Sequence, residues 1–95
     1  MTTITVNQLK NLIGSINLIV LRSSSSFNNN HIPSSKNIEY NALINSPNIY
    51  LDKNKKYYLY CQRGIKSSKA CSYLDKFGYN VVNIAGGYES WILEN

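Results

Sequence analysis

The sequence contains little cysteine, few acidic residues and no long apolar run. Its 95 residues include two cysteines, too few for a disulfide-rich secreted scaffold, and the first ten residues lack the pattern of a secretory signal. We therefore expect a reducing compartment, the cytoplasm. No apolar stretch approaches the roughly 18–20 residues that span a bilayer, so we expect no transmembrane segment and no membrane partner.

Acidic residues are half as common as basic ones, five against ten, which gives a formal net charge of +5. Such an excess can serve nucleic-acid binding. Here the bases are scattered along the chain, and only Lys53, Lys55 and Lys56 cluster. We therefore expect a solvated basic surface and no nucleic-acid partner. One histidine and two distant cysteines also supply too few ligands for a metal site.

The length fits one domain spanning residues 1–95. Apolar and aromatic runs predict strands at residues 18–21, 57–60 and 81–84, and a short strand around Ile4. Helical spacing predicts helices over residues 6–13, 41–44, 67–77 and 88–93, whereas residues 23–30 are expected to form a loop that includes one helical turn. Strands that alternate with helices predict an α/β fold with a small, mostly parallel sheet.

Cys61 lies where a predicted strand ends and a predicted helix is about to begin. Ligands of open α/β sheets bind at the carboxyl ends of strands, and a helix start offers free backbone N–H groups. Both features would stabilise a thiolate or a persulfide anion, and Arg63, Lys66 and Lys69 add positive charge nearby. Gly64 allows the chain to curl with its amides turned toward the sulfur. We expect Cys61 to be a nucleophile.

The segment from Cys61 to Ser67, Cys-Gln-Arg-Gly-Ile-Lys-Ser, resembles the active-site loop of rhodanese-like sulfurtransferases, written C-x-x-G-x-R-S. Three further segments are similar to motifs of that family. Residues 18–22 resemble L-I-D-V-R, residues 31–33 resemble the start of H-I-P-G-A, and residues 80–91 resemble the closing V-x-x-L-x-G-G-x-x-x-W. The four motifs stand in the family's order and spacing and cover nearly the whole chain.

This resemblance implies a parallel sheet with helices on both faces and a two-step exchange of sulfur. Cys61 would take sulfane sulfur from an anionic donor such as thiosulfate, and a thiol or cyanide acceptor would then remove it. No metal or organic cofactor is implied. The residues implied to bind the donor and to surround the sulfur are Gln62, Arg63, Gly64, Ile65, Lys66 and Ser67.

The sequence departs from the family pattern at three places. Val20 stands where the family has Asp, and Lys66 replaces an Arg, which keeps the charge but loses the bidentate guanidinium. Ser34 and Ser35 replace the Gly-Ala that follows the proline. These changes bear on donor preference and rate more than on the class of reaction.

Several alternatives remain at this point. A cysteine phosphatase needs a C-x5-R loop, but the sixth residue after Cys61 is Ser67, so this activity is disfavoured. A sulfur relay fed by a protein donor is the second hypothesis for the Cys61 loop. Cys71 shares a helical face with apolar residues and is expected in the core. We also expect structural roles for His31 and Arg22.

Overall fold

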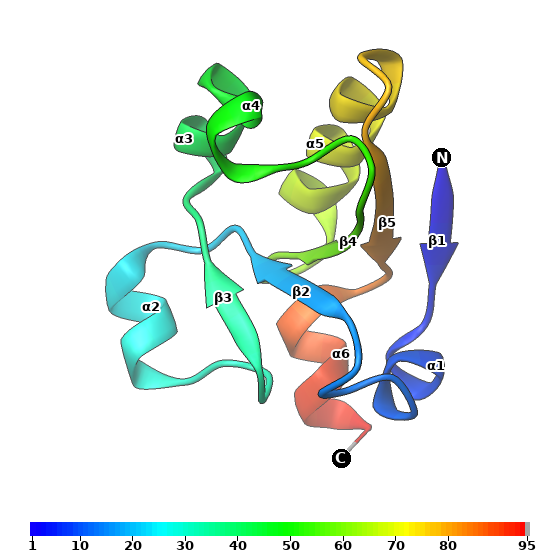
Figure 1. Ribbon diagram of the computed structural model, residues 1–95. Coiled ribbons are helices and arrows are strands. Elements are labelled where there is room, and N and C mark those ends of the chain that lie inside the picture. Colours follow the sequence, from blue (N-terminus) through cyan, green and yellow to red (C-terminus); the bar gives the residue numbers. More distant parts are fainter. Residues whose placement is uncertain (95) are drawn as a thin grey trace.

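The computed structural model describes residues 1–94, and its strands form one sheet in the order β1-β5-β4-β2-β3 (Figure 1). Every neighbouring pair within these residues is parallel. This confirms the predicted α/β class. The strands are β1 (Thr2–Ile4), β2 (Asn17–Val20), β3 (Ser35–Asn37), β4 (Lys56–Tyr60) and β5 (Asn80–Ile84).

The helices cover both faces of the sheet, as the family resemblance implies. They are α1 (Val6–Lys10), α2 (Ser24–Asn29), α3 (Tyr40–Asn45), α4 (Pro47–Tyr50), α5 (Ile65–Lys76) and α6 (Gly87–Leu93). One apolar cluster joins α3 and α5 to the sheet through Leu43, Ala70 and Leu74. The cluster on the opposite face takes Leu9 from α1, with Phe27 of α2 and Trp91 of α6 packed against it. Figure 1 shows α6 and α5 on opposite sides of the strands.

The pleat of β4 decides on which face of the sheet the Cys61 side chain lies. Side chains alternate along a strand, so Leu59 packs with the α5 cluster and Tyr60 with the opposite one. Cys61 continues the alternation and returns to the α5 side. A run of residues buried on both faces is what a central strand of a parallel sheet requires, because helices cover both of its sides.

The buried Tyr60 ties the strand to the loop that precedes β3. Its hydroxyl accepts the Ile32 backbone N–H at 3.0 Å and lies 2.8 Å from the Ser35 hydroxyl oxygen. Burial raises the pKa of this phenol above its usual value. His31 stacks on Phe27, and its Nδ1 lies 2.8 Å from the Phe27 carbonyl oxygen, so its contacts are structural as expected.

Several local predictions were wrong. Residues 24–29 form helix α2, which is longer than the single turn expected within a loop, because the Ser23 side chain caps the helix by accepting the Ser26 N–H and Phe27 packs against the core. Helix α1 ends at Lys10, short of the expected residue 13. Helix α5 begins at Ile65, two residues before Ser67. Strand β3 and helix α4 were not predicted, although Pro47 suits the first turn of a helix.

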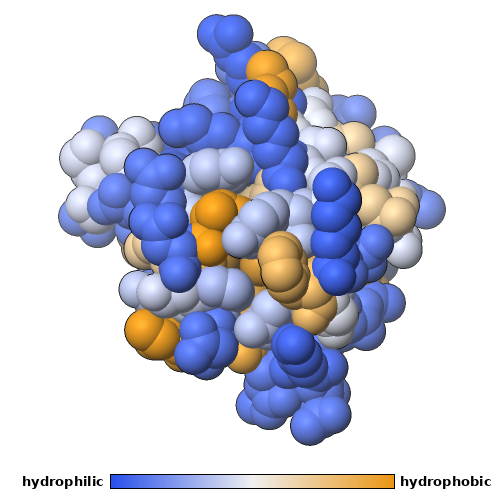
Figure 2. All heavy atoms as spheres, turned by 90° about the horizontal axis from the view of Figure 1, so that it is seen from above, coloured by the Kyte–Doolittle hydropathy of each residue, from blue (hydrophilic) through white to orange (hydrophobic). Residues whose placement is uncertain are grey.

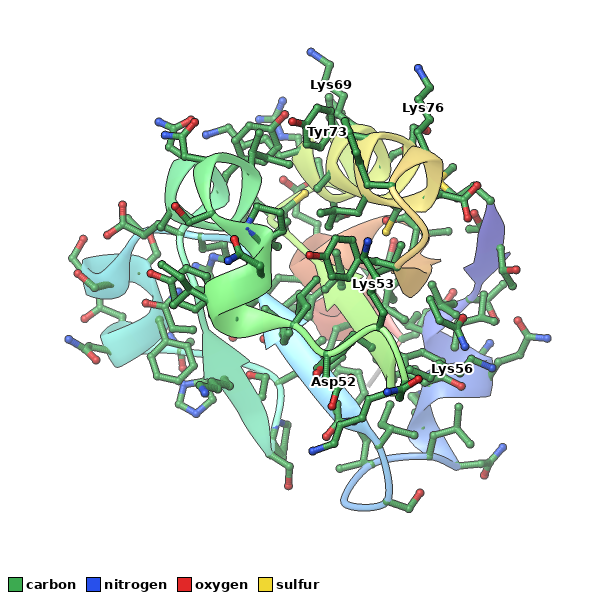
Figure 3. All side chains as sticks on the ribbon, turned by 45° about the horizontal axis from the view of Figure 1, so that its top comes forward. Asp52, Lys53, Lys56, Lys69, Tyr73 and Lys76 are labelled. Carbon is green, nitrogen blue, oxygen red and sulfur yellow. The ribbon has the colours of Figure 1, made fainter. Side chains whose placement is uncertain are left out.

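The face of the molecule that Figure 2 shows is largely polar. Seen from above, apolar residues appear as small separate spots among hydrophilic ones (Figure 2). The outer side of α5 carries Lys69, Tyr73 and Lys76, which project away from the sheet (Figure 3). Within residues 1–94, no helix combines the length and apolar character needed to cross a membrane.

Candidate active site

The Cys61 sulfur lies at the start of α5 and accepts two backbone hydrogen bonds. The Gly64 N–H donates to Sγ at 3.2 Å and the Ser67 N–H donates at 3.3 Å. These N–H groups belong to the first turn of the helix, where backbone donors have no partner within the helix. The sulfur can therefore carry negative charge with donors already in place, although the residue is only 4% exposed.

Gly64 makes this turn possible. It precedes α5 in a left-handed conformation with φ of 92°, which a side chain would oppose. A Cβ at this position would also lie 3.0 Å from the backbone nitrogen of Gly86. The close approach of these two glycines brings the Cys61 loop (residues 61–67) against the start of α6.

The N-terminus of α6 holds the carbonyl groups of the same loop. The Tyr88 N–H donates to the Cys61 carbonyl oxygen at 2.9 Å, and the Glu89 N–H donates to the Gln62 carbonyl oxygen at 3.0 Å. Gly87 allows this contact, because a Cβ there would lie 2.1 Å from the Cys61 carbonyl oxygen. The loop is thus fixed from the outside by α6, which leaves its N–H groups free to face the sulfur.

Two buried polar side chains extend the contacts of the sulfur toward β5. The Cys61 thiol donates to the Ser67 hydroxyl oxygen at 3.5 Å, and the Ser67 hydroxyl donates to Asn83 Oδ1 at 2.7 Å. Ser67 is 0% exposed and Asn83 is 5% exposed. The sequence signal for Asn83 is a polar residue within the apolar run of β5, which predicts a strand position and nothing more.

A pocket of about 610 Å³ opens beside the Cys61 loop. Three cationic residues line it, Arg22, Arg63 and Lys66, and no acidic residue is among its lining residues within the described chain. The remaining lining residues are Leu21, Ser23, Ser26, Cys61, Gln62 and Ile65. An opening with this charge suits a small anion in contact with the sulfur.

The three cationic side chains that line the pocket differ in how strongly neighbouring groups fix their positions. Arg22 donates from Nη1 to the Asn30 carbonyl oxygen at 2.9 Å, and its guanidinium lies 4.5 Å from the centre of the Tyr88 ring. These contacts are the anchoring role we expected, and they also fix the charge at the pocket wall. Arg63 pairs through Nε with Glu89 Oε2 at 3.0 Å, but both side chains are well exposed. Lys66 is exposed on the first turn of α5.

The structure brings the predicted site residues together in two groups. Cys61, Gly64 and Ser67 meet at the sulfur, whereas the other members of the predicted set, Gln62, Arg63, Ile65 and Lys66, line the pocket. Leu21, Ser23 and Ser26 also line the pocket, although they are not among the predicted site residues. No sequence signal pointed to them, because they enter from the end of β2 and the start of α2.

Cys71 lies in the core, as predicted. Its side chain is 0% exposed, and burial raises the pKa of the thiol to about 12. Val20, which stands where the resemblance implies Asp, is also fully buried among apolar residues, on the α6 side of the sheet. Among residues 1–94 no three His, Cys, Asp or Glu side chains gather as a metal site would require.

Residues 5–94 match the model of the rhodanese-like domain. The chain belongs to this family. Thiosulfate sulfurtransferase GlpE of Shewanella oneidensis is 30% identical over 91 residues, which cover 93% of this rhodanese-like domain and 89% of GlpE. The Bacillus subtilis protein YtwF, which carries a sulfurtransferase name, is 44% identical over 41 residues, 43% of this chain and 40% of YtwF.

Solved structures agree with the fold. A rhodanese-related protein of Thermoplasma volcanium superimposes with a TM-score of 0.90 at 29% identity, over 100% of this chain and 94% of that protein. The human single-domain sulfurtransferase TSTD1 superimposes with a TM-score of 0.83 at 20% identity, over 100% of this chain and 98% of that chain. The predicted family is therefore confirmed.

Proposed function

We propose that this rhodanese-like domain is a sulfurtransferase in which Cys61 carries the transferred sulfur. The observation that supports this most is the Cys61 sulfur itself. It faces two backbone N–H groups at 3.2 and 3.3 Å at a helix start, beside a pocket lined by cations. Preorganised donors of this kind stabilise negative charge without having to reorganise during the reaction.

The first step is attack of the Cys61 thiolate on the outer sulfur of the donor. With thiosulfate, an S–S bond forms to Sγ, the S–S bond of the donor breaks, and sulfite leaves with the electron pair. The product is a Cys61 persulfide whose outer sulfur carries the negative charge. The proton of the original thiol passes to solvent, and Gly64 and Ser67 donate to the sulfur throughout.

The second step regenerates the Cys61 thiolate. A thiophilic acceptor attacks the outer sulfur, the S–S bond of the persulfide breaks, and its electron pair stays on Sγ as thiolate. Cyanide leaves as thiocyanate, and a thiol acceptor leaves as its own persulfide. The domain needs no metal or organic cofactor in this scheme, because a sulfur atom is the only group transferred.

The charge of the pocket supports an anionic donor. Arg22, Arg63 and Lys66 line it together, and Arg22 is fixed by its contacts with Asn30 and Tyr88. A doubly charged donor gains from such a site before it reaches the sulfur. The name of the GlpE relative favours thiosulfate within this class. Both cysteines are free, which supports a reducing compartment such as the cytoplasm.

A protein donor is the second candidate, and Ile65 is the observation that favours it. This side chain is 61% exposed at the pocket, between the lining residues Arg63 and Lys66. An exposed apolar residue flanked by charges suits a protein surface better than a small anion. Under this alternative the domain relays a persulfide and turns over thiosulfate slowly.

Mass spectrometry after incubation with thiosulfate tests the proposal. We expect a gain of about 32 Da on the peptide that contains Cys61, and its loss with release of thiocyanate when cyanide is added. A gain that appears only with a cysteine desulfurase, and not with thiosulfate, would favour the relay. An unmodified Cys61 under both conditions would contradict sulfur transfer.

A further inference from the structure

Apart from the tyrosines and cysteines, the described residues bury two polar side chains, Ser67 and Asn83, and both lie next to the Cys61 sulfur in one line of contacts. Burying a hydroxyl and an amide in an apolar core costs free energy unless they are hydrogen-bonded. The Ser67 hydroxyl and the Asn83 side-chain oxygen satisfy each other at 2.7 Å, and the Ser67 oxygen lies 3.5 Å from the sulfur. The contacts of Ser67 and Asn83 therefore form one chain that ends at the Cys61 sulfur, separate from the buried hydroxyl of Tyr60.

That chain of contacts has a direction. The Cys61 thiol donates to the Ser67 oxygen, and the Ser67 hydroxyl donates its single proton to Asn83 Oδ1. This arrangement suits a protonated sulfur, which is a donor. Once the sulfur is an anion it can only accept, so the Ser67 proton would have to turn toward it. The Ser67 oxygen and Asn83 Oδ1 would then face each other as two acceptors.

The amide of Asn83 can remove this conflict. An asparagine side chain presents an acceptor oxygen on one side and a donor nitrogen on the other, so a half-turn exchanges their places. Within residues 1–94 the Nδ2 group makes no hydrogen bond to protein that the turn would break. After the turn, Nδ2 donates to the Ser67 oxygen, and Ser67 donates to the sulfur.

We propose that Asn83 is a positioning residue whose side-chain amide reverses when Cys61 changes from thiol to anion. It thereby directs the Ser67 hydroxyl toward the charged sulfur. The thiol proton leaves to solvent, and no covalent bond other than S–H changes. The proposal rests on the proposed function in one respect, because an anionic Cys61 matters for the protein only if the sulfur reacts.

Other charged and titratable groups surround the sulfur and must be held constant in any test. They come from the end of β2, from the Cys61 loop, from α5 and from α6: Arg22, Arg63, Lys66, Cys71 and Glu89. None of them is altered in the variants below. A change seen on altering Asn83 is therefore not caused by removal of a neighbouring charge.

The first test compares the rate of Cys61 alkylation by iodoacetamide in Asn83→Leu, Ser67→Ala and the double variant. Leucine fills a similar volume but neither donates nor accepts. We expect Asn83→Leu to slow alkylation near neutral pH about fivefold, the effect of one net hydrogen bond. We expect it to have no further effect in the Ser67→Ala background, because Asn83 acts through Ser67.

The matched control is Asn80→Leu, the same substitution at an exposed position of the same strand. It should leave the alkylation rate unchanged. An Asn83→Leu protein that reacts at the wild-type rate would overturn the proposal. The proposal would also be overturned if Asn83→Leu slowed alkylation by the same factor in the wild-type and Ser67→Ala backgrounds. An equal effect would mean that the substitution acts on the structure and not through the Ser67 hydroxyl.

A second measurement needs no variant at position 83. In nuclear magnetic resonance spectra of the wild-type protein, the Asn83 side-chain NH2 signals should move with pH. They should share the midpoint of the alkylation rate, and the movement should vanish in Ser67→Ala. Signals that stay fixed across that midpoint would refute the reversal. Neither measurement uses a sulfur donor, so failure of thiosulfate to modify Cys61 would reject the proposed function alone.

Discussion

The backbone N–H of Tyr88 donates to the carbonyl oxygen of Cys61 at 2.9 Å. The first turn of α6 therefore holds the backbone of Cys61, while the first turn of α5 donates to its sulfur. Gly87 permits this contact because it has no side chain. The position of the sulfur therefore depends on a helix that follows it by more than twenty residues in sequence.

Replacing Gly87 by alanine should lower the free energy of unfolding and displace the Cys61 loop. The new Cβ would lie 2.1 Å from the Cys61 carbonyl oxygen, at a φ of 57° that favours glycine. We expect the free energy of unfolding in urea to fall by more than in Gly14→Ala. That control also has a positive φ, 87°, but its Cβ would meet nothing within 4 Å, so it should lose about 1–2 kcal/mol. An equal loss of free energy of unfolding in the two variants would mean that the Cys61 loop moves aside for the methyl group without further cost.

Replacing each cysteine separately distinguishes the proposed sulfur carrier, Cys61, from the core thiol, Cys71. Cys61→Ser should abolish the gain of sulfur from thiosulfate, because a hydroxyl is a poor nucleophile at neutral pH. Cys71→Ala should keep it, since Cys71 is 0% exposed. Intact-mass spectra of both variants check this directly. A persulfide in Cys61→Ser would show that another group carries the sulfur.

The buried Cys71 should also make stability depend on pH. Its pKa rises from the ordinary 9.0 to about 12 in the folded protein, because burial disfavours the thiolate. Between these two pKa values the Cys71 thiol is ionised in the unfolded protein but not in the folded one, so deprotonation favours unfolding. Stability that is present below the ordinary pKa is therefore lost as the pH rises toward the pKa of the folded protein.

Chemical denaturation of the wild type and of Cys71→Ala at about pH 8 and about pH 10.5 measures this contribution. The wild type should lose more free energy of unfolding over that interval than the variant, and subtraction cancels the shared effects of lysines and tyrosines. The same loss in both proteins would mean that Cys71 titrates normally.

Lys66 should matter for donor affinity, whereas Lys69 should not. Both lie on α5, but Lys66 lines the pocket and Lys69 projects outward from the helix (Figure 3). Lys66→Ala should raise the KM for thiosulfate about two- to fivefold, as expected for an exposed ion pair, with kcat nearly unchanged. Steady-state kinetics at low and high salt test this. Lys66→Arg should restore binding, and an equal effect of Lys69→Ala would point to net charge instead.

The sequence was most informative where apolar residues are continuous. The run at residues 18–21 and the aromatic run before Cys61 predicted β2 and β4, because central strands of a parallel sheet are buried on both faces. The order of strand, turn and helix then placed Cys61 correctly relative to α5. Gly64 was expected to curl the loop, but it is also the N-cap residue directly before Ile65, which is why α5 starts earlier than predicted.

The features that the sequence did not reveal depend on tertiary contacts. Helix α2 is rich in serine and asparagine, which have low helix propensity, and its Phe27 packs against the core of the folded protein. Strand β3 carries no apolar pattern and exists through its pairing with β2. The contact of α6 with the Cys61 loop could not be predicted either, since two glycines in a turn do not indicate which backbone they approach.

The burial of Cys71 has a consequence for oxidative damage. A cysteine that is oxidised to sulfenic acid can be rescued by a second thiol, which condenses with it to a disulfide. Within these 95 residues the other thiol is sealed inside the core. If Cys61 is oxidised, we expect its recovery to need a thiol from outside these 95 residues, so the working lifetime of the domain would follow the supply of such thiols.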